Sequence, residues 1–258
     1  DAVFRGNTNI LARSGPINLI GGLGIANGIW YNNGVFNLGY TTGYSDLPTS
    51  SSDITLKFDR FNWGVYPSFS TAGKIVWAPI DKSTSFGQSV STAFFQWNKN
   101  SLIPSGITIG KDGSTADVLL DNALTANGSI NVYGGNLYVN QSLISSSSGQ
   151  GILLKSTGFV NGASGITLQT NNGPIIIWSN SNGSSTAGGV WFGDSDTFNT
   201  ANGSSTQTTG GGNFTVGGGT TTISDASGNA VPSGAASTNA SYGISFGTNS
   251  SGSTVTTI

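Results

Sequence analysis

Short apolar clusters recur along the middle of the chain at a nearly constant interval. One series advances in steps of 23, 22 and 23 residues and consists of Ile107, Ile130, Ile152 and Ile175. A second series advances in steps of 22, 24 and 24 residues and consists of Ile144, Ile166, Val190 and Phe214. Two interleaved series that share one long period are typical of a coil with two or three short strands in each turn. Hairpin sandwiches would instead give strands every 8–12 residues or so, without a longer period.

This repeat predicts an all-β fold, a right-handed parallel β-helix (a solenoid) with coils of about 22–24 residues. Alternate side chains of each short strand would point into a narrow core, and successive rungs would stack about 4.8 Å apart. Glycine and asparagine supply the sharp turns that the corners need, for example at 134–136 and 171–173. At about 23 residues per coil, the chain would make about eleven coils.

The two parts of the chain differ in composition. Residues 1–100 hold most of the aromatic side chains, and irregular stretches at 28–43 and 61–69 separate the strand-like clusters. We therefore expect an aromatic-rich β region in the N-terminal third, packed on the helix or capping it, in which these stretches form long loops or an extra hairpin. Residues 101–258 are expected to form regular coils with Gly/Ser/Thr-rich loops.

Composition excludes several classes of function. The chain has no His and no Cys, which removes Ser-His-Asp and Cys-His catalysis, imidazole or thiolate metal sites and disulfides. A net charge of -2 argues against a nucleic-acid partner, which would need a basic surface. No apolar run approaches the roughly 20 residues of a membrane-spanning helix, so no membrane span is expected.

Four phrases carry a family resemblance: GITIGKD from residue 106, GSINVYGGNLYVN from 128, GILLKSTG from 151 and GITLQTNNGPIIIWS from 165. They resemble the repeats of filamentous-haemagglutinin-type exoproteins, which are very large secreted bacterial adhesins and related passengers. The resemblance covers about residues 100–195. It implies a right-handed β-helical shaft, an extracellular or cell-surface location, and a role in adhesion or in building surface structures.

Two signals expected of a complete exoprotein are missing. The sequence has no Asn-Pro-Asn-Gly secretion motif and no signal peptide at its start. We therefore expect the chain to be an interior piece or a processed product of a longer precursor.

Asp194 and Asp196 flank Ser195 directly after a strand-like cluster. The pair admits three interpretations: half of a calcium site completed by backbone carbonyls, the acid pair of a glycoside hydrolase, or carboxylates that satisfy amide groups at a corner. The corner role is the commonest of the three. Calcium is the one cofactor that the sequence offers, and we expect no enzyme because acidic and basic residues are too sparse to build a catalytic groove.

Aromatic side chains in the first hundred residues form the other candidate site: Trp30, Tyr31, Trp63, Tyr66 and Trp97. Trp and Tyr anchor protein interfaces, and their faces suit the stacking of sugar rings. The same residues would equally serve as packing between loops and coils, so packing, a subunit contact and glycan binding all stay open.

The ends of a β-helix expose unpaired strand edges unless they are capped. The last six residues form a strand-like segment without charge, and neither a lysine nor a proline protects it. We expect the terminal rungs, at Val3, Phe4, Val255 and Ile258, to pair end to end with another copy or with neighbouring coils of a longer precursor.

Two classes of function follow from these features. The first is an extracellular structural or adhesive shaft that assembles into a filament or forms part of a larger adhesin. The second is a carbohydrate-binding or polysaccharide-processing module like a tailspike, with cell-surface glycans as partners. The low charge of the chain favours the first.

Overall fold

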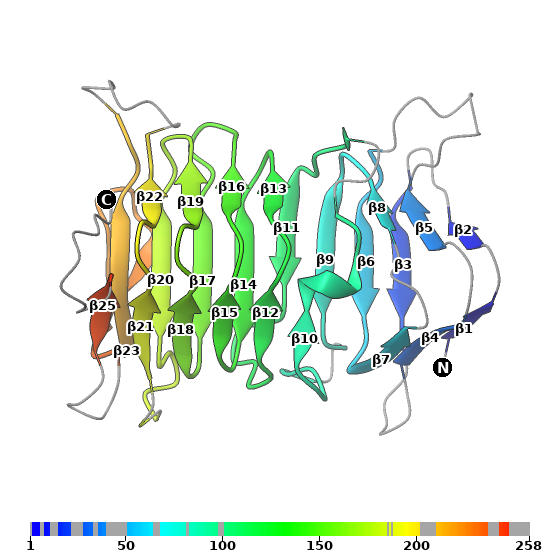
Figure 1. The fold of residues 1–258 in the computed structure, drawn as a ribbon, viewed down its shortest axis with the longest axis horizontal. Helices are drawn as coiled ribbons and strands as arrows, with labels where there is room; N and C mark the ends of the chain where they lie inside the picture. Colours follow the sequence, from blue (N-terminus) through cyan, green and yellow to red (C-terminus); the bar gives the residue numbers. More distant parts are fainter. Residues whose placement is uncertain are drawn as a thin grey trace.

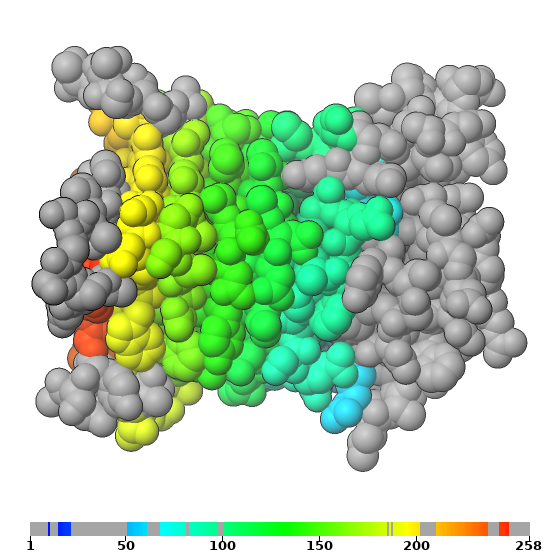
Figure 2. Space-filling model, viewed as in Figure 1, coloured from blue at the N-terminus to red at the C-terminus, as the bar shows by residue number. Residues whose placement is uncertain are grey.

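The computed structural model describes most of the chain. The described residues are 2–5, 8–10, 15–21, 28–32, 36–39, 51–63, 68–80, 83–97, 101–184, 186, 188–201, 210–236 and 243–247. They form a stack of coils, most of them built from three strands that face three directions (Figure 1). The coils follow one another along the long axis, and Figure 2 shows them as successive colour bands. No helix in this part of the chain is long and apolar enough to span a membrane.

One side of the stack is a continuous sheet of nine strands, called sheet 1 here. Its strands are β3 (Ile17–Ile20), β6 (Ile54–Lys57), β9 (Lys74–Ala78), β11 (Gly106–Ile109), β14 (Ile130–Gly134), β17 (Ile152–Ser156), β20 (Ile175–Ser179), β23 (Phe214–Ser224) and β24 (Ala230–Gly234). All of the pairings are parallel except β23 with β24. Because β11 pairs with β9, sheet 1 continues through residue 100, where the composition changes.

The second side carries two ladders. They are β1 (Ala2–Arg5), β4 (Gly28–Asn32) and β7 (Arg60–Trp63), then β10 (Val90–Ser91), β12 (Val118–Leu120), β15 (Leu137–Val139), β18 (Phe159–Gly162), β21 (Gly189–Phe192) and β25 (Ile244–Phe246). The ladder from β10 to β25 is called sheet 2 here. A short 3₁₀ helix, Thr92–Phe94, follows β10.

The third side also carries two ladders. They are β2 (Thr8–Ile10), β5 (Phe36–Gly39) and β8 (Ser68–Ser70), then β13 (Leu124–Ala126), β16 (Leu143–Ser145), β19 (Thr167–Thr170) and β22 (Thr197–Asn199). Together the three sides confirm the predicted parallel β-helix.

The core lies between the three sides. In β14 and β17 buried residues alternate with half-buried ones, as expected for strands with one face inside. The isoleucine series is confirmed as a ladder, since Ile107, Ile130, Ile152 and Ile175 are successive register partners. All four are at most 1% exposed. The ladder also extends to Ile75 and Ile54 in one direction and to Phe214 in the other.

The second predicted series is wrong. Ile144 pairs with Gln169 on the third side, Val190 pairs with Val160 on the second, and Phe214 belongs to sheet 1. The corners beside these strands differ in length from coil to coil. Residues at a constant spacing in the sequence are therefore not successive register partners on one side of the β-helix there.

Because the corners differ in length, the described residues form fewer coils than a uniform spacing predicts. Sheet 1 has eight parallel rungs in the described residues, that is, its nine strands less the antiparallel β24. Register partners are 37 residues apart from Ile17 to Ile54 and 39 apart from Ile175 to Phe214. A uniform spacing of about 23 residues, with about eleven coils, is therefore wrong outside the middle of the chain.

Two stretches expected as long loops or an extra hairpin contain strands of the parallel ladders instead. Residues 28–43 include β4 and β5, and residues 61–69 include most of β7 and part of β8. Each of these strands pairs in parallel with the coil before or after it. These strands lack the alternating aliphatic residues of the middle coils, so the sequence pattern did not reveal them.

Candidate functional site

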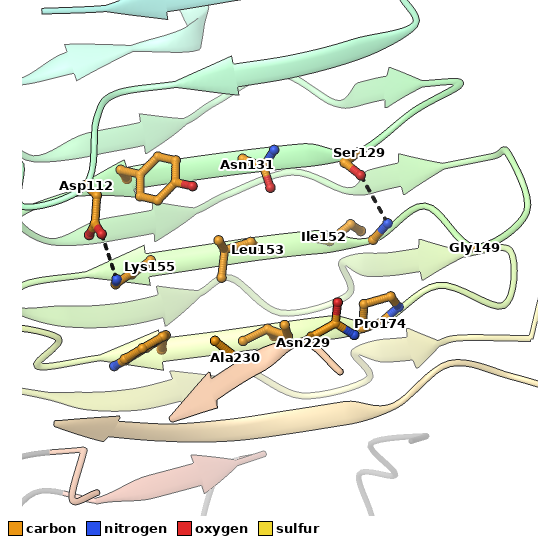
Figure 3. A pocket seen from close by; sticks show the side chains of 14 residues that line it. Asp112, Ser129, Asn131, Gly149, Ile152, Leu153, Lys155, Pro174, Asn229 and Ala230 are labelled. Atoms are coloured by element: carbon orange, nitrogen blue, oxygen red, sulfur yellow. Dashed lines mark hydrogen bonds and ion pairs between the residues drawn. The ribbon is translucent and has the colours of Figure 1, made fainter. Parts of the chain in front are cut away.

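The outer face of sheet 1 carries side chains of mixed chemistry. Each strand in the middle of the sheet presents two outward residues between its buried ones. On β14, β17 and β20 these are Asn131, Tyr133, Leu153, Lys155, Ile176 and Trp178 (Figure 3). The register stacks them in two columns, so that Leu153 lies between Asn131 and Ile176, and Lys155 between Tyr133 and Trp178.

A β-hairpin closes one side of this surface. After pairing with β20, the long strand β23 turns back through β24, and residues 229–230 come to lie beside Pro174 and Ile176. The indole N–H of Trp178 donates to the Gly219 carbonyl at 2.8 Å, and the Ser179 hydroxyl donates to the Ala236 carbonyl at 3.0 Å. Consequently β20 is buried on both faces, unlike β14 and β17.

The hairpin and the sheet enclose a hollow of about 380 Å³. Its lining includes Asn131, Leu153 and Ile176 on the strands of sheet 1, and its rim includes Ser129, Pro174 and Asn229, which directly precede β14, β20 and β24. A second hollow of about 270 Å³ lies over β9, β11 and β14 and shares Ser129 and Asn131 with the first. The two hollows lie in line across the rungs, along the axis of the β-helix, and together they are called the groove here.

Lys155 is held by two groups at one edge of the groove. Its Nζ lies 2.9 Å from Oδ2 of Asp112 and 4.2 Å from the ring centroid of Trp178. Asp112 precedes Gly113, whose φ of 84° supplies the turn that brings the carboxylate back toward the sheet. Burial, and secondly the Asp112 charge, raise the pKa of the neighbouring Tyr133, so its hydroxyl stays protonated at neutral pH.

The predicted carboxylate pair lies on a different part of the molecule. Asp194 and Asp196 flank Ser195, which has a φ of 62°, in the turn between β21 and β22. Asp196 is 1% exposed, and its Oδ1 accepts the amide of Ile166 at 3.0 Å. Burial raises the pKa of Asp196, and the amide of Ile166 acts against this rise. The described residues contain no group of three or more acidic side chains that could hold a metal, so calcium stays a prediction.

Three of the predicted aromatic residues lie on strands of one ladder. Trp30 and Tyr31 lie in β4, Trp63 lies in β7, and the register pairs Tyr31 with Trp63. Trp97 lies elsewhere and packs at the core: its ring centroid is 4.9 Å from that of Phe69, and its indole N–H donates to the Thr92 carbonyl at 2.8 Å. Tyr66 lies outside the described residues.

Of the residues predicted to form the terminal rungs, the structure describes those near the N-terminus. Val3 and Phe4 lie in β1, which is the outermost strand of its ladder, and Phe4 pairs with Tyr31. Val255 and Ile258 lie outside the described residues.

Sequence reasoning missed the groove. Leu153, Ile176 and Trp178 occupy outward positions of the isoleucine repeat, and apolar residues at such positions were the available signal. The pairing of Asp112 with Lys155 gave no signal, because the two residues are 43 positions apart in the chain.

Comparison with known proteins gave no match: no family model, no curated protein and no solved structure matches the chain.

Proposed function

We propose that this protein is an extracellular structural or adhesive shaft that assembles end to end into a filament. The observation that carries the proposal is the ladder of sheet 1, where register partners continue from β3 to β23 above one apolar core. Each interior rung is hydrogen-bonded on both sides, so the coils form a stiff element suited to reach and display. The resemblance of residues 100–195 to repeats of secreted adhesins supports the same role.

The last strand of sheet 2 supports assembly through the ends. Ile244 of β25 pairs with Val190, whose side chain is fully buried, and so continues the inward column of that sheet. Yet Ile244 is 47% exposed, as expected of an apolar side chain on the outermost described strand of its sheet. Among the described strands, β25 has β21 as its one neighbour, and a strand edge with an apolar side chain is a ready template for another chain.

Negative-stain electron microscopy with light scattering on the same sample tests this proposal. We expect filaments, and we expect Ile244→Lys to shorten or abolish them because a lysine on a terminal rung opposes strand pairing. Asn161→Lys is the matched control, since it adds the same charge to the exposed outer face of an interior strand, β18, of the same sheet. Monodisperse short rods of the unaltered protein would refute end-to-end assembly.

A further inference from the structure

We propose that the groove across sheet 1 binds a linear, uncharged glycan that lies along the axis of the β-helix. The juxtaposition that carries this inference is an apolar floor at Leu153, beside the hairpin that covers Ile176, between polar side chains on both rims. The inference goes beyond the shaft function, because it assigns a ligand to a face that a shaft does not require.

The chemistry of the lining matches a sugar chain. Asn131 offers an amide donor and acceptor, and Tyr133 offers a hydroxyl that can do both. Asn229 offers its side-chain oxygen, since its side-chain nitrogen donates to Asp225, while the Ser129 hydroxyl already donates to Oε1 of Gln150. Sugar hydroxyls also donate and accept, while the C–H faces of the rings need apolar contacts such as Leu153. A site for a purely apolar ligand would lack these polar groups.

The charges of the groove favour a neutral ligand. Lys155 and Asp112 form an ion pair at 2.9 Å, so their charges offset each other. Lys74 is the other charged side chain among the groove-lining residues that the structure describes, and it lies at the opposite end. A nucleic acid would need several unpaired basic groups along its path.

The position of the groove disfavours a peptide. An extended peptide binds best by adding a strand to a free sheet edge, and an amphipathic helix needs a wide apolar trough. This groove lies on the face of sheet 1, where the backbone groups of β14 and β17 are engaged in the ladder. A ligand in this groove would therefore be bound by side chains and not by backbone groups.

The length of the groove sets the size of the ligand. The two hollows share Ser129 and Asn131 and together extend from β9 to β20, five rungs of sheet 1. Successive rungs are about 4.8 Å apart, so several sugar units fit in line. Among the described groove-lining residues Asp112 is the one carboxylate, whereas glycoside cleavage uses two, so the groove is assigned to binding alone.

Calorimetry with the full chain tests the inference, using hexaoses of cellulose, xylan and mannan, their disaccharides, and a galacturonic acid hexamer. We expect at least one neutral hexaose to bind, and to bind more tightly than its disaccharide. The double variant Asn131→Ala/Tyr133→Phe removes two polar partners and should weaken that binding by about tenfold or more. Its matched control is Asn161→Ala/Tyr138→Phe, which makes the same changes on the outer face of sheet 2 and should bind as the unaltered protein does.

Circular dichroism establishes that both variants are folded, and electron microscopy separates this inference from the shaft proposal, because the groove variant should assemble normally. Three results would overturn the inference. The first is no binding of any neutral hexaose, the second is binding of the charged hexamer alone, and the third is equal affinity of the groove variant and the unaltered protein.

Discussion

At the scale of single residues, one inward column of sheet 2 combines side chains of very different size. Val139, Gly162 and Phe192 are successive register partners on sheet 2. A Cβ added at Gly162 would lie 2.1 Å from Cδ1 of Phe192, so the glycine makes room for the ring of the next coil. The ring of Phe192 in turn packs at 4.9 Å, centroid to centroid, on Phe198. Close packing of this kind leaves little tolerance for added volume.

Gly162→Ala should therefore lower the free energy of unfolding by about 1–3 kcal/mol, because overpacking displaces Phe192. Urea denaturation measures the change. Gly15→Ala is the control, since no heavy atom lies within 4 Å of an added Cβ there, and it should change stability by less than about 0.5 kcal/mol. In a chain that also carries Phe192→Leu, Gly162→Ala should lower the free energy of unfolding by less than it does alone. Additive effects of the two substitutions would contradict this account.

At the scale of elements, the β23–β24 hairpin departs from the parallel pattern of the coils. Asp225, at its turn, accepts the amides of Ser227 and Asn229 at 2.9 and 2.8 Å and the side-chain amide of Asn213 at 2.9 Å. These bonds tie the turn to the start of β23. Because the hairpin also buries Trp178 and Ile176, one turn residue helps to maintain a wall of the groove.

Hydrogen bonds, first from the side chain of Asn229, lower the pKa of Asp225 from 3.8 to about 2. The contribution of Asp225 to stability is therefore fully present above about pH 4 and is lost as the pH falls toward 2. In an NMR titration, we expect the backbone amide signal of Asn229 to shift with a midpoint near pH 2. Asp225→Asn should abolish the shift while it retains one acceptor for the turn. A midpoint near 3.8 would show that the turn does not hold the carboxylate.

At the scale of the whole molecule, coils interact with their nearest neighbours alone, so stability depends on position along the stack. Strands β14 and β17 pair on both sides, whereas β25 pairs on one. In hydrogen exchange, we expect the amides of β14 and β17 to be the slowest and those of β25 and the hairpin to exchange faster through local opening. Uniform protection along the stack would contradict this expectation. Assembly into filaments would selectively slow the hydrogen exchange of the β25 amides.

The sequence by itself determined the class of fold and the inward ladder from Ile107 to Ile175. Those coils have corners of nearly equal length, so a regular spacing in the chain becomes a regular column in space. Where corners vary, as on the second and third sides, strand pairing alone decided the register, and the series through Ile144 and Val190 failed for that reason. The groove was likewise a product of tertiary structure. Stacking brings Asp112 to Lys155, and the hairpin brings Asn229 to Pro174, although each pair is more than 40 residues apart in the chain. No local pattern encodes such pairs, because their proximity depends on how many residues each coil inserts between rungs.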